Sequence, residues 1–118
     1  MLVNLQTILS DTRAKKYAVG SFNVYSYETI KGVFESMKEL QRPAIVAFGE
    51  KYLENMDFEI VADIVKYFGN KTHLPVVLHL DHCKETKNIY KAAKAGFTSV
   101  MYDGSAYGFG QNVKNTRR

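Results

Sequence analysis

Four short apolar runs, separated by stretches of helical periodicity, constrain the fold of this chain most strongly. The runs, rich in β-branched and aromatic residues, lie at 17–25, 44–48, 76–80 and 98–102. Between them, apolar residues recur at spacings of three and four, as in helices that cover a sheet. Strands that alternate with helices through short loops form right-handed βαβ units. The sequence therefore predicts an α/β fold of about four parallel strands alternating with helices.

Capping residues mark the ends of the expected helices. Asn4 can cap a short first helix that ends near Lys15. Ser26 and Asp57 stand immediately before the next two periodic stretches, where an N-terminal cap is expected. Gly96 follows the fourth stretch and can adopt the left-handed conformation that ends a helix.

The length of the chain limits how much of a larger fold it can contain. At 118 residues, with 46% hydrophobic and 24% charged residues, it has the composition of one globular domain. A complete eight-stranded α/β barrel needs about 250 residues. A single domain over residues 1–118 could therefore hold only part of such a barrel, and we expect no second domain.

Composition also excludes several classes of protein. The net charge is +4, and no stripe of Lys and Arg interleaved with aromatic residues points to a nucleic-acid partner. No apolar run has the length of a signal peptide core or a membrane span. The single cysteine, Cys83, excludes an internal disulfide and fits a reducing compartment. We expect a cytoplasmic protein with no nucleic-acid and no membrane partner.

Residues 75–84 carry the most informative side chains of the chain. An apolar run begins after a proline and ends in Asp81 and His82. Strand alternation places Asp81 on the same face as His79, and the leucines of the run on the opposite face. Because α/β barrels present their chemistry at the carboxyl ends of strands, Asp81 is expected to point inward. His82 follows at the mouth, where it is free to face a metal.

Polar residues also end two of the other expected strands. Alternation places Asn23 on the inward face of the first strand, and Asp103 on the same face as Ser99 and Met101. Both side chains are therefore expected to point to the same mouth as Asp81. Polar groups at the carboxyl ends of three strands predict a binding or catalytic site there.

The motif that carries a family resemblance is LHLDH, with YAVGSFNVYSYET upstream and AGFTSVMYDGS downstream. At these spacings the chain resembles the class II, metal-dependent ketose-bisphosphate aldolases, the group that acts on fructose and tagatose bisphosphates. The resemblance runs to about Val113 and covers the first half of such an enzyme. It implies the N-terminal half of a (β/α)8 TIM barrel, a lyase of glycolysis and carbohydrate metabolism, and a homo-oligomer for the full-length family.

The resemblance also assigns roles to individual residues. Asp81 takes the place of the family's acid/base at the C4 hydroxyl, and His82 that of the first zinc ligand. Asp103 corresponds to an auxiliary or alternative metal ligand, and Asn23 is expected to touch substrate near a phosphate or hydroxyl. The implied cofactor is Zn2+, whose remaining ligands would come from later strands, and the implied partner is a phosphorylated ketose. The implied reaction is reversible cleavage of a ketose 1,6-bisphosphate to glycerone phosphate and glyceraldehyde 3-phosphate.

Alternatives remain open for several of these residues. Asp81 could instead cap the helix expected to begin near Glu85, since Asp often precedes helices. His79 is better interpreted as a core histidine satisfied by a neighbour than as a metal ligand. The chain as a whole, close to inactive alone, could be a non-catalytic half-barrel that self-associates or pairs with another chain through its open strand edges. Fructose and tagatose bisphosphate are not distinguished.

Overall fold

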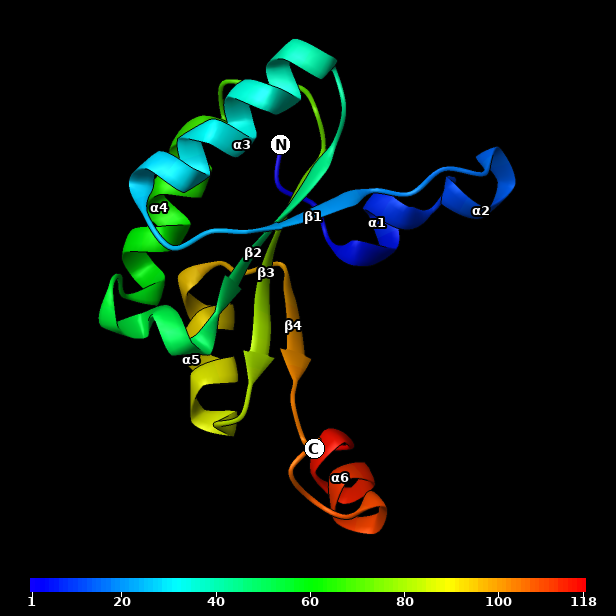
Figure 1. The fold of residues 1–118 in the computed structure, drawn as a ribbon, viewed down its shortest axis with the longest axis vertical. Coiled ribbons are helices and arrows are strands. Elements are labelled where there is room, and N and C mark those ends of the chain that lie inside the picture. Colours follow the sequence, from blue (N-terminus) through cyan, green and yellow to red (C-terminus); the bar gives the residue numbers. More distant parts are fainter.

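A computed structural model, which describes residues 1–118, contains one sheet of four parallel strands (Figure 1). The strands are β1 (Gly20–Asn23), β2 (Ala44–Gly49), β3 (Val76–Cys83) and β4 (Ser99–Tyr102). Their order across the sheet is β1-β2-β3-β4, which is also their order along the chain. Each strand is followed by a helical segment, so the predicted α/β fold is confirmed.

Helices precede the first strand, connect the strands to one another and follow the last strand. They are α1 (Leu5–Leu9), α2 (Thr12–Lys15), α3 (Tyr27–Leu40), the 3-10 helix η1 (Glu50–Glu54), α4 (Phe58–Gly69), α5 (Thr86–Ala95) and α6 (Phe109–Thr116). Helices α3 and α4 pack against each other, as do α4 and α5, along one face of the sheet (Figure 1). None of the helices combines the length and the apolar character needed to cross a membrane.

The expected helix caps form at Asn4 and Ser26. The Asn4 side chain accepts a hydrogen bond from the Thr7 amide, and Ser26 and Thr29 form a reciprocal capping box. Asp57 precedes α4 as expected, but its side chain makes no capping hydrogen bond. Gly96 ends α5 with φ of 114°, a conformation that side-chain-bearing residues rarely adopt.

Three element boundaries differ from those expected from the sequence. Strand β1 is shorter than the strand predicted at residues 17–25, because it pairs with a single neighbour over only four residues. Strand β3 extends beyond 76–80 because β2 and β4 pair with it on both sides, so Asp81 and His82 lie within the strand. The helix expected to end near Lys15 is broken into α1 and α2. There the Thr12 hydroxyl donates to the Leu9 carbonyl and competes with the helical backbone.

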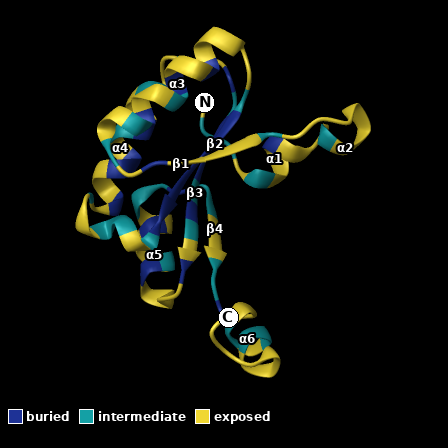
Figure 2. Cartoon of the chain, viewed as in Figure 1, coloured by how far each residue is buried: buried dark blue, intermediate teal, exposed yellow.

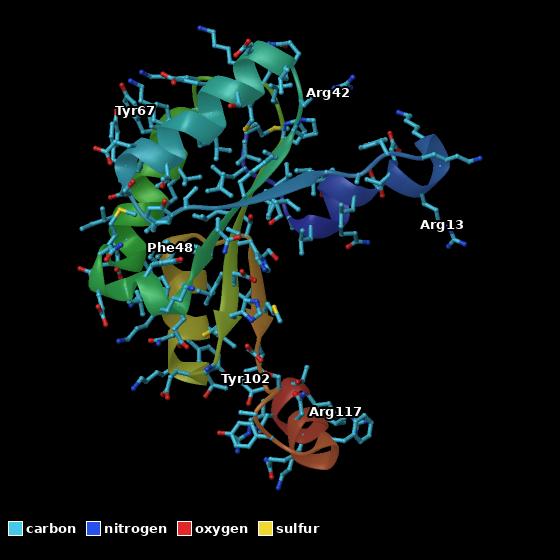
Figure 3. The ribbon with its side chains drawn as sticks, viewed as in Figure 1. Arg13, Arg42, Phe48, Tyr67, Tyr102 and Arg117 are labelled. Atoms are coloured by element: carbon cyan, nitrogen blue, oxygen red, sulfur yellow. The ribbon has the colours of Figure 1, made fainter.

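The two faces of the sheet bury different side chains. Alternate residues of β2 and β3, including Phe48, Leu78 and Leu80, join the helices in the main core. Figure 3 labels Phe48 among the side chains. On the opposite face, Ile45 and Val77 pack with Ile8 of α1 in a smaller cluster. The predicted alternation is confirmed. Each fully buried apolar side chain stabilises the fold by about 1.5–3 kcal/mol relative to exposure.

Candidate functional site

The carboxyl ends of the parallel strands meet at one edge of the sheet, which we call the rim. The structure brings the sequence-predicted Asn23, Asp81, His82 and Asp103 together at this rim. Asn23 ends β1, Asp81 and His82 lie near the end of β3, and Asp103 directly follows β4. Across the sheet, the Asn23 side-chain nitrogen lies 3.4 Å from Asp81 Oδ2, which makes a long hydrogen bond.

His82 is held between two carboxylates. Its Nδ1 lies 2.9 Å from Asp103 Oδ2, and its Nε2 lies 3.9 Å from Asp81 Oδ1. The hydrogen bond with Asp103, supported by the charge of Asp81, raises the pKa of His82 above its ordinary value. The His82 side chain is 64% exposed, so its Nε2 remains accessible from the mouth.

Asp103 uses its two carboxylate oxygens for two purposes. Oδ1 accepts hydrogen bonds from the Ser105 hydroxyl at 2.6 Å and the Ser105 amide at 3.1 Å, while Oδ2 faces His82. The bonds from Ser105 and then from His82 hold the pKa of Asp103 well below its usual range. The Asp103 amide also donates to the Cys83 carbonyl at 2.7 Å. A fixed, ionised carboxylate therefore orients the imidazole.

The backbone at His82 departs from regular strand geometry. Its φ is 49°, and the pairing of β3 with β4 is irregular between Leu80 and Cys83. A left-handed conformation costs a residue with a side chain about 1–2 kcal/mol. Successive side chains of a regular strand point to opposite faces, and this turn instead lets His82 approach Asp81.

His79 lies behind Asp81 and is satisfied by a neighbour. Its Nδ1 is 2.7 Å from the Ser99 hydroxyl, and its Nε2 is 3.7 Å from Asp81 Oδ1. Burial lowers the pKa of His79, although the charge of Asp81 opposes this effect. The neighbour expected for His79 is therefore present, since the Ser99 hydroxyl partners its ring, and the half-buried imidazole lies beside Asp81.

Glu50, which begins η1 directly after β2, is a rim residue that the sequence analysis missed. Its carboxylate accepts hydrogen bonds from the amides of Lys84 and Glu85, the side chain of Asn88 and the thiol of Cys83. Burial raises the pKa of Glu50, but these hydrogen bonds outweigh it and lower the pKa overall. The available signal was its position, one residue beyond a strand that ends at the same rim as β3.

The hydrogen bonds of Glu50 also bear on the alternative role of Asp81 as the cap of α5. Glu85 is the N-cap residue of α5 but provides no side-chain cap, and Glu50 supplies the acceptor for this terminus from another element. Asp81 bonds instead with Asn23 across the sheet. The capping interpretation of Asp81 is therefore wrong.

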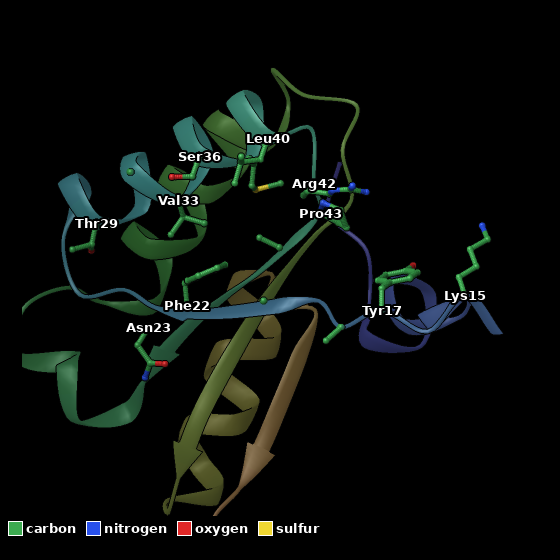
Figure 4. Close-up of a pocket in the computed structure, with 15 residues that line it drawn as sticks. Lys15, Tyr17, Phe22, Asn23, Thr29, Val33, Ser36, Leu40, Arg42 and Pro43 are labelled. Carbon is green, nitrogen blue, oxygen red and sulfur yellow. The ribbon is translucent and has the colours of Figure 1, made fainter. Parts of the chain in front are cut away.

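A hollow lies between β1 and α3 and reaches the rim only at Asn23 (Figure 4). This groove has a volume of about 1110 Å³, and Phe22, Val33, Met37 and Leu40 form its apolar lining. Its lining contains no Asp, Glu, His or Cys, and of the predicted site residues it includes only Asn23. The titratable side chains of the rim therefore lie outside this groove.

The donor set at the rim fits part of a catalytic metal site. Metal-ligating histidines commonly hold their second nitrogen against a carboxylate, as His82 does with Asp103. Catalytic zinc takes three protein ligands and keeps an open position. No group of three or more His, Cys, Asp or Glu side chains in the chain is arranged to hold a metal. The chain can thus supply one imidazole and nearby carboxylates.

The sequence matches a known protein family and several of its members. The family described as class-II fructose-bisphosphate aldolase matches residues 3–118. The fructose-bisphosphate aldolase of Helicobacter pylori (strain J99) is 35% identical over 119 residues, covering 100% of this chain and 39% of that protein. The sulfofructosephosphate aldolase of Alkalicoccus urumqiensis is 33% identical over 112 residues, which cover 95% of this chain and 39% of that protein.

The crystal structure of the YdjI aldolase from Escherichia coli K12 has the same fold over this region. It superposes with a TM-score of 0.92 at 32% identity, covering 99% of this chain and 44% of that chain. The chain spans about two fifths of the length of the relatives it matches. Together with the four-stranded parallel sheet, these matches show that the chain belongs to the class II fructose-bisphosphate aldolase family.

Proposed function

We propose that this chain forms the acid/base and first metal-ligand portion of a zinc-dependent aldolase. The reaction is reversible cleavage of a ketose 1,6-bisphosphate to glycerone phosphate and glyceraldehyde 3-phosphate. Residues 1–118 form one incomplete barrel domain in this proposal. The observation that carries it is the pairing of His82 with Asp103 at 2.9 Å beside Asp81, at the carboxyl ends of neighbouring parallel strands.

Asp81 is the acid/base at the C4 hydroxyl. Its carboxylate takes the hydroxyl proton as the C3–C4 bond breaks, C4 becomes an aldehyde, and the bonding electrons pass to C3. In the direction of condensation it returns the proton. The side chain is 19% exposed between His79 and His82, so it is shielded yet reachable from the mouth.

His82 is the metal ligand, with Asp103 as its orienting partner and an auxiliary ligand. A bound Zn2+ would act as a Lewis acid that stabilises negative charge developing on the ketone half of the substrate. The hydrogen bond of Asp103 at Nδ1 fixes the ring so that Nε2 is the nitrogen that faces the mouth.

Asn23 is the substrate-binding residue. Its 3.4 Å contact with Asp81 is long, so a substrate hydroxyl can replace this weak bond at little cost. The side-chain amide can then hold that hydroxyl, or a phosphate oxygen, next to the acid/base. Fructose and tagatose bisphosphates both meet this requirement.

The test is Zn2+ titration of the purified chain, followed through the imidazole resonances of its histidines. We expect Zn2+ to shift the His82 ring in the parent chain and in the control His73→Ala, whose histidine lies exposed away from the rim. The shift should disappear in His82→Ala, and Asp103→Asn should weaken binding by about 10–100-fold. Equal zinc uptake by the parent and His82→Ala would contradict the assignment.

Cleavage of fructose and tagatose 1,6-bisphosphate should be measured on the same samples. Because the chain provides fewer than three arranged ligands, we expect cleavage no faster than background. Stoichiometric zinc with cleavage that His82→Ala removes would mean that copies of this chain assemble a complete site.

A second candidate function is a non-catalytic half-barrel that self-associates or pairs with another chain. The observation that favours it is the sheet itself, because β1 and β4 each have a strand neighbour on one side only. Open edges with unpaired backbone groups invite pairing. Concentration-dependent mass by light scattering tests this candidate independently of zinc.

A further inference from the structure

We propose that Glu50 is a positioning residue that holds the turn at His82 in the shape required for metal binding. The inference rests on the proposed role of His82 as a metal ligand. It concerns a residue outside the set of Asn23, Asp81, His82 and Asp103 that the family resemblance assigns.

Glu50 joins two connections that are distant in sequence. It begins η1 just beyond β2, and its carboxylate reaches the segment between β3 and α5. Oε2 accepts from the Lys84 amide at 2.9 Å, and Oε1 accepts from the Glu85 amide at 3.2 Å and Asn88 Nδ2 at 2.8 Å. The Cys83 thiol adds a contact of 3.3 Å to Oε1. All of these donors follow His82 closely in the chain.

These bonds constrain the backbone that leaves His82. The residue has φ of 49°, which an isolated strand would relax toward extended backbone. Upstream, β3 is fixed by pairing with β2 and β4, and downstream Glu50 fixes Lys84 and Glu85. The His82 ring therefore meets Asp103 because the backbone on both sides of it is anchored.

The chemistry of the site calls for a carboxylate at this position. An ionised carboxylate is an acceptor at both oxygens, and every group that faces Glu50 here is a donor. Glutamine has the same size, but its NH2 group would oppose an N–H donor on one side. Glu50→Gln thus removes an acceptor without opening a cavity, and it leaves the backbone amide of Lys84 or of Glu85 without a hydrogen-bond acceptor.

Two control variants distinguish a positioning role of Glu50 from the effects of losing a carboxylate in η1 or one hydrogen bond of the network. Glu54→Gln makes the same chemical change at an exposed residue of the same 3-10 helix that forms no side-chain hydrogen bond or ion pair. Asn88→Ala removes one donor of the network while Glu50 still accepts from the Lys84 and Glu85 amides. Glu50→Ala is included only where it folds, as judged by circular dichroism.

The experiment uses the 118-residue chain and records the tautomer of the His82 ring by 15N NMR, then Co2+-induced broadening of its Hε1 signal. In the parent, Glu54→Gln and Asn88→Ala, we expect one tautomer and selective broadening of His82. In Glu50→Gln we expect a mixed tautomer and a Co2+ affinity lower by about tenfold, at temperatures well below unfolding.

Each outcome of this experiment decides the proposal. If Glu50→Gln lowers the melting temperature but keeps the parent tautomer and Co2+ response, Glu50 only caps α5 and the proposal is wrong. If Co2+ leaves His82 unaffected even in the parent, the proposed metal role fails. The tautomer of Glu50→Gln then still shows whether Glu50 positions the ring.

Discussion

Two phenylalanines on neighbouring strands have opposite environments. Phe48 on β2 is fully buried, with the rings of Tyr52, Phe58 and Phe97 centred 6.3, 6.3 and 6.5 Å away. Phe22 on β1 is 51% exposed and lines the open groove. Figure 2 shows the same contrast for whole strands, with β2 buried throughout and β1 exposed throughout. The two strands differ in their position in the sheet, because β2 has a strand neighbour on both sides and β1 has one on a single side.

The buried residues of the sheet are concentrated in its central strands, whereas the residues of the rim come from the centre and from both edges. The central strands β2 and β3 carry most of the sheet's contribution to the core, whereas the edge strands contribute Asn23 and the aspartate that orients His82. The site therefore spans the centre of the sheet and both of its edges, where each strand has a single strand neighbour. Substitutions that compare centre with edge test this division directly.

The largest effect is expected at the centre, for Phe48→Ala. Removing a ring with no exposed surface leaves a cavity among three aromatic neighbours, so the free energy of unfolding should fall by about 3–5 kcal/mol. Urea unfolding followed by circular dichroism measures this change. A loss below about 1 kcal/mol would show that the centre does not dominate stability.

The next prediction concerns Gly96, which ends α5 just before the edge strand β4. Gly96 has φ of 114°, so Gly96→Ala should lower the free energy of unfolding by about 1–2 kcal/mol through backbone strain. The control is Gly32→Ala in α3, where an added Cβ meets nothing within 4 Å and should stabilise by about 0.5–1 kcal/mol. Changes of the same sign in both variants would contradict this explanation.

A pH dependence tests the link that Glu50 makes between β2 and β3. Glu50→Gln should reduce stability by about 1 kcal/mol at pH 7, because an acceptor of backbone amides is lost. The folded pKa of Glu50 lies below its ordinary value of 4.5. The advantage of the parent is therefore complete above about pH 4.5 and shrinks as pH falls through the lower folded pKa. Urea unfolding at several pH values measures the gap, and a gap that stays constant would exclude the charge of Glu50 as its source.

The sequence predicted the centre of the fold better than its edges. Alternation within 76–80 correctly placed Leu78 and Leu80 against the helices, because a strand buried on both faces has a strong apolar signal. The first strand was predicted too long, since its ladder depends on a neighbour that local pattern cannot reveal. The left-handed turn at His82 and the bonds of Glu50 depend on contacts between distant segments, so no local pattern predicts them.

The smallest effect on stability, and the sharpest test of the comparison, is expected at the edge. Phe22→Ala should change the free energy of unfolding by less than about 0.5 kcal/mol, because its side chain is already half exposed. It should nevertheless weaken self-association, since Phe22 lies in the apolar groove beside the open edge of β1.

Phe109→Ala on α6 is the matched control, an 87% exposed phenylalanine outside the groove. Light scattering across a concentration series distinguishes the two variants. Equal mass curves for both would show that the β1 edge attracts no partner, whereas a shift only in Phe22→Ala would identify this edge as the surface through which copies of the chain meet.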